Sequence, residues 1–255
     1  MTGLRRAIAL FTVVPVGHLG DLDRAEAVAA LRWFPLLGAA LGAVAGLPAV
    51  AVLHWASHAQ LLGGVLSVLL LALLTRGLHL DGLADTLDGL GSRAPAERAL
   101  EIMRRSDVGP FGVIAIVLVL LIDVAALGSY NGDCVWWPVA VLAVAAATGR
   151  LAALLGAHRS VPSARAEGFG AYVAGSQSSV VLVIEAAVVL GFGAGMAAAV
   201  DASVVGWVVA QAAALVVTTA FLLHTRGRLG GVTGDVFGAL VEIATALTLA
   251  GLTLS

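Results

Sequence analysis

The stretch VGPFGVIAIVLVLLIDVAALGSY, residues 108–130, carries a single charged side chain, that of Asp123. A helix that crosses a bilayer needs about 20 consecutive, mostly apolar residues, and this stretch supplies them. Further apolar stretches of similar length lie at roughly 33–56, 60–80, 134–157, 178–200, 202–223 and 235–254. Because a helix satisfies its own backbone hydrogen bonds in lipid, we expect an all-α, polytopic integral membrane bundle of about seven transmembrane helices.

The composition of the whole chain agrees with this expectation. Of the 255 residues, 60% are hydrophobic and 12% are charged, and the mean hydropathy is +1.01. The charged share is about half of that in soluble domains. Because apolar stretches fill the chain, we expect one membrane-embedded domain over residues 1–255, with residues 7–16 as a buried or interfacial segment. The net charge of −2 gives no indication of a nucleic-acid partner. The chain has no lysine, which excludes Schiff-base chemistry.

The basic residues, all fourteen of them arginines, predict the topology. Some precede the first apolar stretch, and others lie around the connection between the second and third. The rest lie at or after the end of the fourth, and between the sixth and seventh. If the stretches alternate in direction, every arginine falls on one side, whereas the connections near 57–60, 130–134 and 200–202 contain none. Positively charged loops stay in the cytoplasm. We therefore expect a cytoplasmic N-terminus and an active site facing the cytoplasm.

Three glycines at intervals of four residues predict close helix packing in the first apolar stretch. Gly38, Gly42 and Gly46 lie on one face of a helix. Small residues on one face allow a neighbouring transmembrane helix to approach closely. We expect a helix to pack against this face.

The segment TRGLHLDGLADTLDGL, residues 75–90, contains three aspartates on one helical stripe. Asp81, Asp85 and Asp88 are spaced i, i+4 and i+7, which places them within about 60° of one another. Such carboxylates repel one another unless a cation lies between them, and no basic residue occupies the neighbouring i±4 positions. Oxygen ligands without cysteine favour Mg²⁺, Mn²⁺ or Ca²⁺ over zinc. The alternative is a solvated helix face.

The segment RGRLGGVTGDVFGALVE, residues 226–242, forms a second group of candidate site residues. Its glycines predict a flexible turn before the last apolar stretch, and Asp235 lies where that helix should begin. A helix N-terminus attracts phosphate through its free N–H groups and its dipole. Asp235 is expected either to belong to the site or to act as the N-cap, with Thr233 as the other candidate cap. Glu242 lies on the same face, seven residues later.

Arginines on the same side are candidate phosphate contacts. The planar guanidinium suits phosphate oxygens, and Arg104, Arg150 and Arg228 are placed for this role; the alternative is that they only anchor the topology. His79, two residues before Asp81, is a candidate substrate contact. Carboxylates, a glycine-rich helix start and arginines together indicate metal-assisted phosphoryl transfer.

These motifs resemble cobalamin synthase, the adenosylcobinamide-GDP ribazoletransferase family of the late vitamin B12 pathway. The matching segments occur in the family's order and are FTVVPV (11–16), RWFPLLGAALGA (32–43), GLHLDGLADTLDGL (77–90), ALEIMRRSDVGPFGV (99–113), a GR pair (149–150), AEGFG (166–170) and GRLGGVTGDVFGALVE (227–242). Many relatives have an acid before, and a base after, the serine near position 106. Here Arg105 and Asp107 have exchanged these places, so a metal role for an acid at position 105 is lost. Asp107 is the alternative for that role, and we assign no metal ligand in this stretch.

The resemblance implies a reaction and a set of site residues. A hydroxyl of α-ribazole, or of its 5′-phosphate, attacks the phosphate attached to adenosylcobinamide; GMP leaves, and adenosylcobalamin or its phosphate forms. Mg²⁺ is the implied cofactor, and the cell inner membrane is the implied location. We assign the residues as follows: catalytic, Asp85 and Asp235; metal-binding, Asp81, Asp85 and Asp88; substrate-binding, His79, Arg104, Arg150 and Arg228.

Two other functions compete with this interpretation. A CDP-alcohol phosphotransferase of lipid synthesis also uses membrane-embedded aspartates, but Asp85 occupies the place of an arginine in its motif. An ion-coupled transporter would explain Asp123, Glu185 and Glu242 within the apolar stretches. A transporter places its acids near the midplane, whereas the dense acidic cluster lies at the rim. The expected partners are small-molecule substrates and membrane lipid; the oligomeric state is open, and a homo-oligomer is compatible with the sequence.

Overall fold

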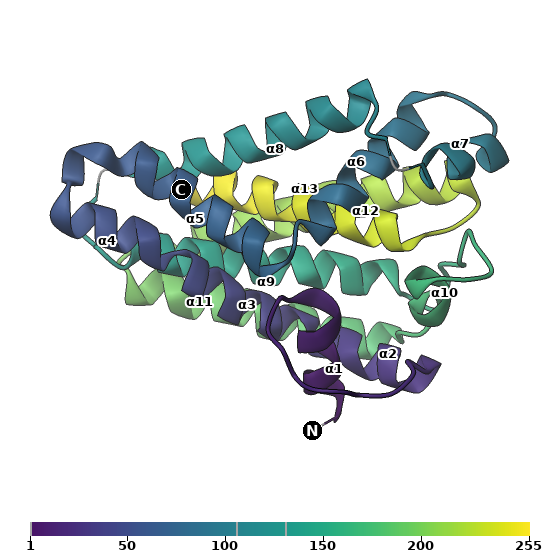
Figure 1. Ribbon diagram of the computed structural model, residues 1–255. Helices are drawn as coiled ribbons and strands as arrows, with labels where there is room; N and C mark the ends of the chain where they lie inside the picture. The colour runs from purple at the N-terminus through teal and green to yellow at the C-terminus, as the bar shows by residue number, and fades with distance from the viewer. Residues whose placement is uncertain (1, 106, 131) are drawn as a thin grey trace.

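The computed structural model describes residues 2–105, 107–130 and 132–255, and within these ranges the elements are helices (Figure 1). They are α1 (Thr2–Phe11), α2 (Arg24–Arg32), α3 (Phe34–Ala45), α4 (Leu47–Trp55), a 3₁₀ turn (Ser57–Ala59), α5 (Gln60–Leu74), α6 (Leu78–Gly91), α7 (Ala96–Ile102), α8 (Pro110–Gly128), α9 (Trp137–Gly156), α10 (Phe169–Val173), α11 (Ser179–Ala199), α12 (Val204–Leu229) and α13 (Gly234–Thr253).

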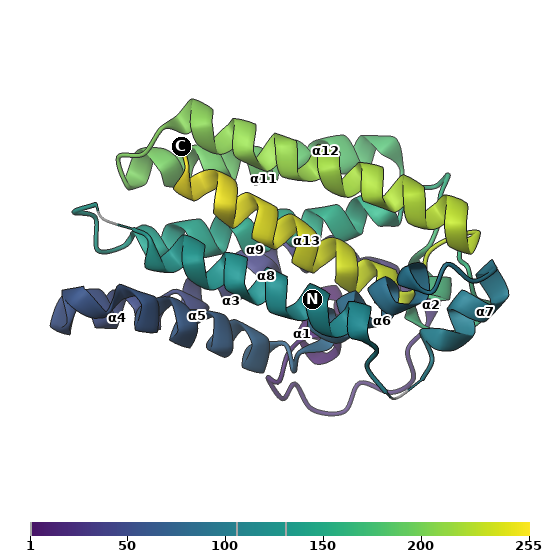
Figure 2. The same cartoon turned by 90° about the horizontal axis from the view of Figure 1, so that it is seen from above.

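The long helices confirm the multi-pass membrane fold. Six segments in the described ranges are long and apolar enough to cross a bilayer: α3 with α4, α8, α9, α11, α12 and α13. The α5–α6 pair makes a seventh if its two parts are counted as one span. Figure 2 shows α11 and α12 along one side of the bundle and α3 to α5 along the other, with α8, α9 and α13 between them.

The sequence predicted one span over residues 60–80, but the structure has two helices there with a sharp bend between them. The helix ends at Leu74, and α6 leaves at 88° to α5. Arg76 and Gly77 both have positive φ, and their N–H groups donate to Leu73 and Ala72 at 3.1 and 2.8 Å. This hydrogen-bond pattern is a Schellman motif, which terminates a helix. The bend turns the acid-bearing helix α6 sharply away from the direction of α5, and α6 packs against α8 and α13.

The glycines of α3 pack against α9, as predicted. A Cβ on Gly38 would lie 2.6 Å from the carbonyl oxygen of Ala146, and a Cβ on Gly46 would lie 2.6 Å from the Cα of Val139. Gly42 faces α9 between them. Side chains larger than hydrogen would separate the two backbones at all three positions. The contact helps to make α9 the central helix, and most of its residues are buried.

The connections that carry arginines meet at one end of the bundle. Arg24 donates to the carbonyl oxygen of Ala171 at 3.1 Å, and Arg228 donates to that of Ala94 at 3.3 Å. Two connections without arginine meet elsewhere with the last residues of α13, because residues 129–130, 132–134, 200–202, 252–253 and 255 line one shared depression. The predicted segregation of the arginine-bearing connections is therefore a property of the fold.

Candidate active site

The site is organised by a close crossing of α6 and α13. A Cβ on Gly82 would lie 2.7 Å from the carbonyl oxygen of Asp235, and one on Gly238 would lie 3.1 Å from that of His79. Glycine is required where two backbones approach this closely. The crossing brings the acid stripe of α6 against the start of α13, and Asp85 lies within electrostatic range of Asp81 and Asp235.

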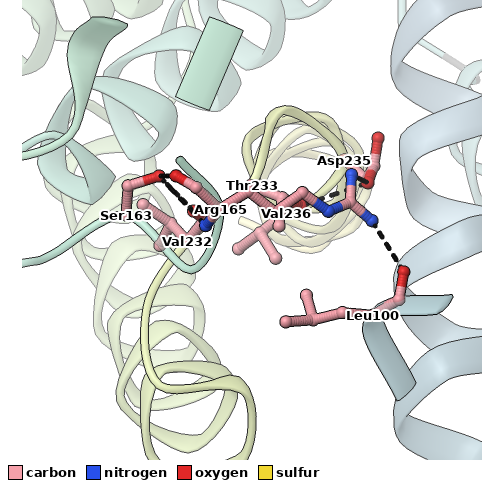
Figure 3. A network of polar contacts seen from close by, with 7 residues as sticks. All are labelled: Leu100, Ser163, Arg165, Val232, Thr233, Asp235 and Val236. Atoms are coloured by element: carbon pink, nitrogen blue, oxygen red, sulfur yellow. Dashed lines mark hydrogen bonds and ion pairs between the residues drawn. The ribbon is translucent and has the colours of Figure 1, made fainter. Parts of the chain in front are cut away.

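Arg165 fixes Asp235 at this crossing (Figure 3). Its Nη1 forms an ion pair with Asp235 Oδ2 at 3.0 Å, and its Nη2 donates to the carbonyl oxygen of Leu100 at 3.1 Å. The hydroxyl of Thr233 donates to the same carboxylate oxygen at 3.2 Å and accepts from the Val236 N–H at 3.3 Å. Thr233 is therefore the N-cap of α13, and Asp235 is available as a site residue in its first turn.

Backbone contacts hold the loop of Arg165 against the glycine-rich turn. The Ala164 N–H donates to the carbonyl oxygen of Val232, and the Val232 N–H donates to that of Pro162, both at 2.9 Å. A Cβ on Gly231 would lie 2.5 Å from the Pro162 oxygen. Figure 3 shows Ser163 and Val232 next to each other near the backbone of Arg165, on the side away from its guanidinium. The two loops therefore form one unit, and this unit sets the direction of the Arg165 side chain.

Asp88 has different surroundings from the other two acids of the stripe. Its Oδ2 accepts from the Gly109 N–H at 2.7 Å, and its Oδ1 accepts from the Gly112 N–H at 2.9 Å. These N–H groups lie at the start of α8, where a helix has no acceptors of its own. Asp88 is buried and acts as a cap for α8 from a neighbouring helix. Across the described ranges, no three His, Cys, Asp or Glu side chains are grouped to hold one metal ion, so the predicted three-acid metal set is not gathered here.

A cavity of about 370 Å³ opens beside the crossing. Its charged side includes Asp81, Arg165 and Asp235. Its apolar side includes Phe11, Phe34, Phe169 and Phe237. A volume of this size lies at the small end of the range for ligand sites, which is about 300–1,000 Å³.

The predicted substrate contact His79 lies in the cavity wall. Its side chain is buried, and neither ring nitrogen has a hydrogen-bond partner among the described residues. The nearest carboxylate oxygen, that of Glu242, is 4.0 Å from Nδ1, which is too far for a hydrogen bond. Arg150 lies behind this wall, fully buried, with its guanidinium carbon 5.8 Å from the centre of the Phe34 ring. The structure thus separates Arg150 from the cavity by an aromatic ring.

The structure does not bring the other two predicted arginines to the cavity. Arg104 is exposed at the end of α7, and Arg228 is exposed with its Nη2 on the carbonyl oxygen of Ala94. Arg105 and Asp107 are exposed as well. Among the described residues, the arginine that lines the cavity is Arg165, which was not among the assigned site residues. Its position directly before the AEGFG segment was the available signal.

The fold and the site together define a polytopic membrane protein with a charged cavity near the arginine-rich end of its bundle. A family model described as cobalamin-5-phosphate synthase matches residues 3–253. The chain belongs to this family, which confirms the resemblance of its motifs and removes the support for the lipid-synthesis and transporter alternatives. No solved structure matches the chain.

Curated relatives of this chain carry the name adenosylcobinamide-GDP ribazoletransferase. The protein of Frankia casuarinae is 40% identical, over 98% of this chain and 93% of the relative. That of Citrobacter koseri is also 40% identical, over 94% of this chain and 93% of the relative. The Roseiflexus protein is 34% identical, over 98% and 88%. The matches therefore cover nearly the whole of this chain.

Proposed function

We infer that the chain is a membrane-embedded transferase that joins adenosylcobinamide-GDP to α-ribazole and releases GMP. The observation that carries this proposal is the crossing at Gly82 and Gly238, which brings HLDGLAD of α6 beside GGVTGD at the start of α13, so that residues of both segments line one cavity. These two segments lie within the part of the chain that the family model matches. The family thus supplies the reaction, and the crossing supplies a place for it.

The chemistry is a displacement at phosphorus. The ribazole hydroxyl forms a bond to the phosphorus attached to adenosylcobinamide, the bond from that phosphorus to GMP breaks, and the hydroxyl proton goes to a carboxylate. We assign that proton to Asp235, which Arg165 and Thr233 orient through Oδ2. Arg165 is itself held by the Leu100 carbonyl oxygen, so its guanidinium is positioned in advance for phosphate oxygens.

Asp81 and Asp85 are the residues we assign to Mg²⁺. Among the described residues, neither carboxylate forms an ion pair, Asp81 is exposed at the cavity and Asp85 is half-buried one turn away. Mg²⁺ is usually held by one or two carboxylates together with substrate phosphates and water, so a two-acid set suits it without Asp88. When bound, the ion neutralises charge on the pyrophosphate.

We also propose the orientation in the cell. The loops with arginine meet at the end of the bundle that contains the cavity, and loops of this kind stay in the cytoplasm. The cavity would then open from the inner membrane to the cytoplasm. Soluble nucleotide substrates are present in the cytoplasm.

The proposed reaction is tested by GMP release from the purified, detergent-solubilised protein. With adenosylcobinamide-GDP, α-ribazole and Mg²⁺, we expect GMP and a cobalamin product to form in equal amounts. Omission of α-ribazole should suppress both. GMP formed at the same rate without α-ribazole would show a hydrolase, and no GMP from a monodisperse, folded preparation would refute the proposal.

A further inference from the structure

The apolar side of the cavity is a continuous group of aromatic rings. The ring of Phe11 lies 4.3 Å from that of Phe34 and 5.4 Å, edge to face, from that of Phe169. Phe237 lies edge to face with Phe169 at 6.4 Å, and His79 is 5.7 Å from Phe34. All five residues line the cavity. Such rings stack on, or pack edge-on against, a flat aromatic ligand.

One polar side chain interrupts this aromatic wall and lacks a partner. His79 is 4% exposed, and both of its ring nitrogens are buried without a hydrogen bond among the described residues. Burying such a group without a partner costs free energy. The ligand that fits this wall is therefore flat and mostly apolar, with one nitrogen or hydroxyl in reach of the imidazole.

The size of the cavity further limits which ligand it can hold. A volume of about 370 Å³ accommodates a nucleoside but not a corrin macrocycle with its side chains. Two nucleoside-sized groups take part in the proposed reaction, the guanosine of the leaving GMP and the acceptor α-ribazole. Guanine has three polar groups on one edge, which need matched partners when buried. The dimethylbenzimidazole of ribazole has one free ring nitrogen and is otherwise apolar.

We propose that the aromatic side of this cavity, formed by Phe11, Phe34, His79, Phe169 and Phe237, binds the benzimidazole base of the acceptor nucleoside. This assignment rests on the proposed function and deepens it. The base lies among the phenylalanines, the imidazole of His79 hydrogen-bonds to its free ring nitrogen, and the ribose extends to the charged side. The acceptor hydroxyl then meets Asp235 and Arg165, whereas the guanosine of the donor remains outside the aromatic wall.

The test compares the two substrates in variants of the wall. Phe169 is the most accessible of the four phenylalanines, so Phe169→Ala is the first variant and His79→Ala the second; Phe192→Ala, a phenylalanine outside this cavity, is the matched control. Loss of one stacking partner should raise the KM for α-ribazole about tenfold or more. The KM for adenosylcobinamide-GDP should change less than about twofold. Phe192→Ala should leave both values at those of the wild type.

Equilibrium dialysis measures binding without turnover. The full-length protein in detergent, without metal, is dialysed against α-ribazole and, separately, against GMP. Binding of α-ribazole should weaken in Phe169→Ala and recover in Phe169→Tyr, and binding of GMP should not change. A rise in KM for adenosylcobinamide-GDP, or weakened GMP binding, would place guanine in the cavity and overturn the assignment. Unchanged constants for both substrates would also overturn it. In both cases the wild type would still release GMP. The assignment of the cavity would then fail while the proposed reaction stands.

Discussion

Asp85 and Asp88 lie one helical turn apart in α6, yet their carboxylates face different neighbours. Asp88 accepts two N–H groups from the start of α8, whereas Asp85 lies among the acids at the α6–α13 crossing. The spacing in the sequence placed both on one stripe. It did not reveal that Asp88 caps a helix beginning about twenty residues later in the chain, because that depends on how α6 and α8 pack.

The capping role of Asp88 predicts a loss of stability on substitution. Asp88→Ala leaves the buried Gly112 N–H and the partly buried Gly109 N–H without their acceptor, and a buried N–H without an acceptor costs roughly 1–3 kcal/mol. We expect a lower melting temperature in detergent, with a smaller decrease for Asp88→Asn, which keeps one acceptor oxygen. Mg²⁺ dependence of the remaining turnover should not change. An unchanged melting temperature together with a weakened response to Mg²⁺ would instead show that Asp88 is a metal ligand.

Substitution of Arg165 should specifically weaken the binding of substrate phosphate. Its guanidinium contacts Asp235 and the Leu100 carbonyl oxygen at once, which the single ammonium of lysine does not reproduce. Arg165→Lys should lower kcat/KM for adenosylcobinamide-GDP about tenfold or more. The exposed Arg226 gives the matched control, and Arg226→Lys should retain the wild-type value. Equal values for the two variants would remove Arg165 from the site.

At the scale of elements, the crossing of α6 and α13 decides whether the site forms. Gly82→Ala would place a methyl group 2.7 Å from the carbonyl oxygen of Asp235 and separate the two helices. We expect turnover to fall at least tenfold while the protein stays in the membrane. Gly191, also within a helix, has open space around its Cα, so Gly191→Ala is the control and should remain active. Full activity of Gly82→Ala would contradict the role of the crossing.

The apolar stretches predicted the long helices well because length and hydropathy alone determine whether a segment can span a bilayer. The bend after Leu74 was missed for a physical reason. Its Schellman motif uses Arg76, a non-glycine residue in the left-handed region, before Gly77. Arg165 was not assigned to the site, because contacts of its loop with Val232, far away in the sequence, determine where its side chain lies. Local pattern thus predicted the elements but not the packing that aims the side chains.

For the whole molecule, the arrangement of the loops predicts opposite accessibility of its two ends. Cys134 is the single cysteine, so a Cys134→Ser chain accepts one new thiol at a time. In intact cells with a permeable outer barrier, Ser255→Cys should react with a membrane-impermeant thiol reagent, and Ser92→Cys should react only after the inner membrane is opened. The reverse pattern would place the cavity on the outer side.

The central claim is that the carboxylates at the α6–α13 crossing are required for phosphoryl transfer. The turnover of Asp85→Asn tests this claim most directly. This change keeps the shape of the side chain and removes its charge. GMP release should fall at least about 100-fold, more than for loss of an indirect metal contact, in a protein with unchanged yield and melting profile. Asp133→Asn, at an exposed position near the other end, should match the wild type. Wild-type turnover by Asp85→Asn would contradict the account.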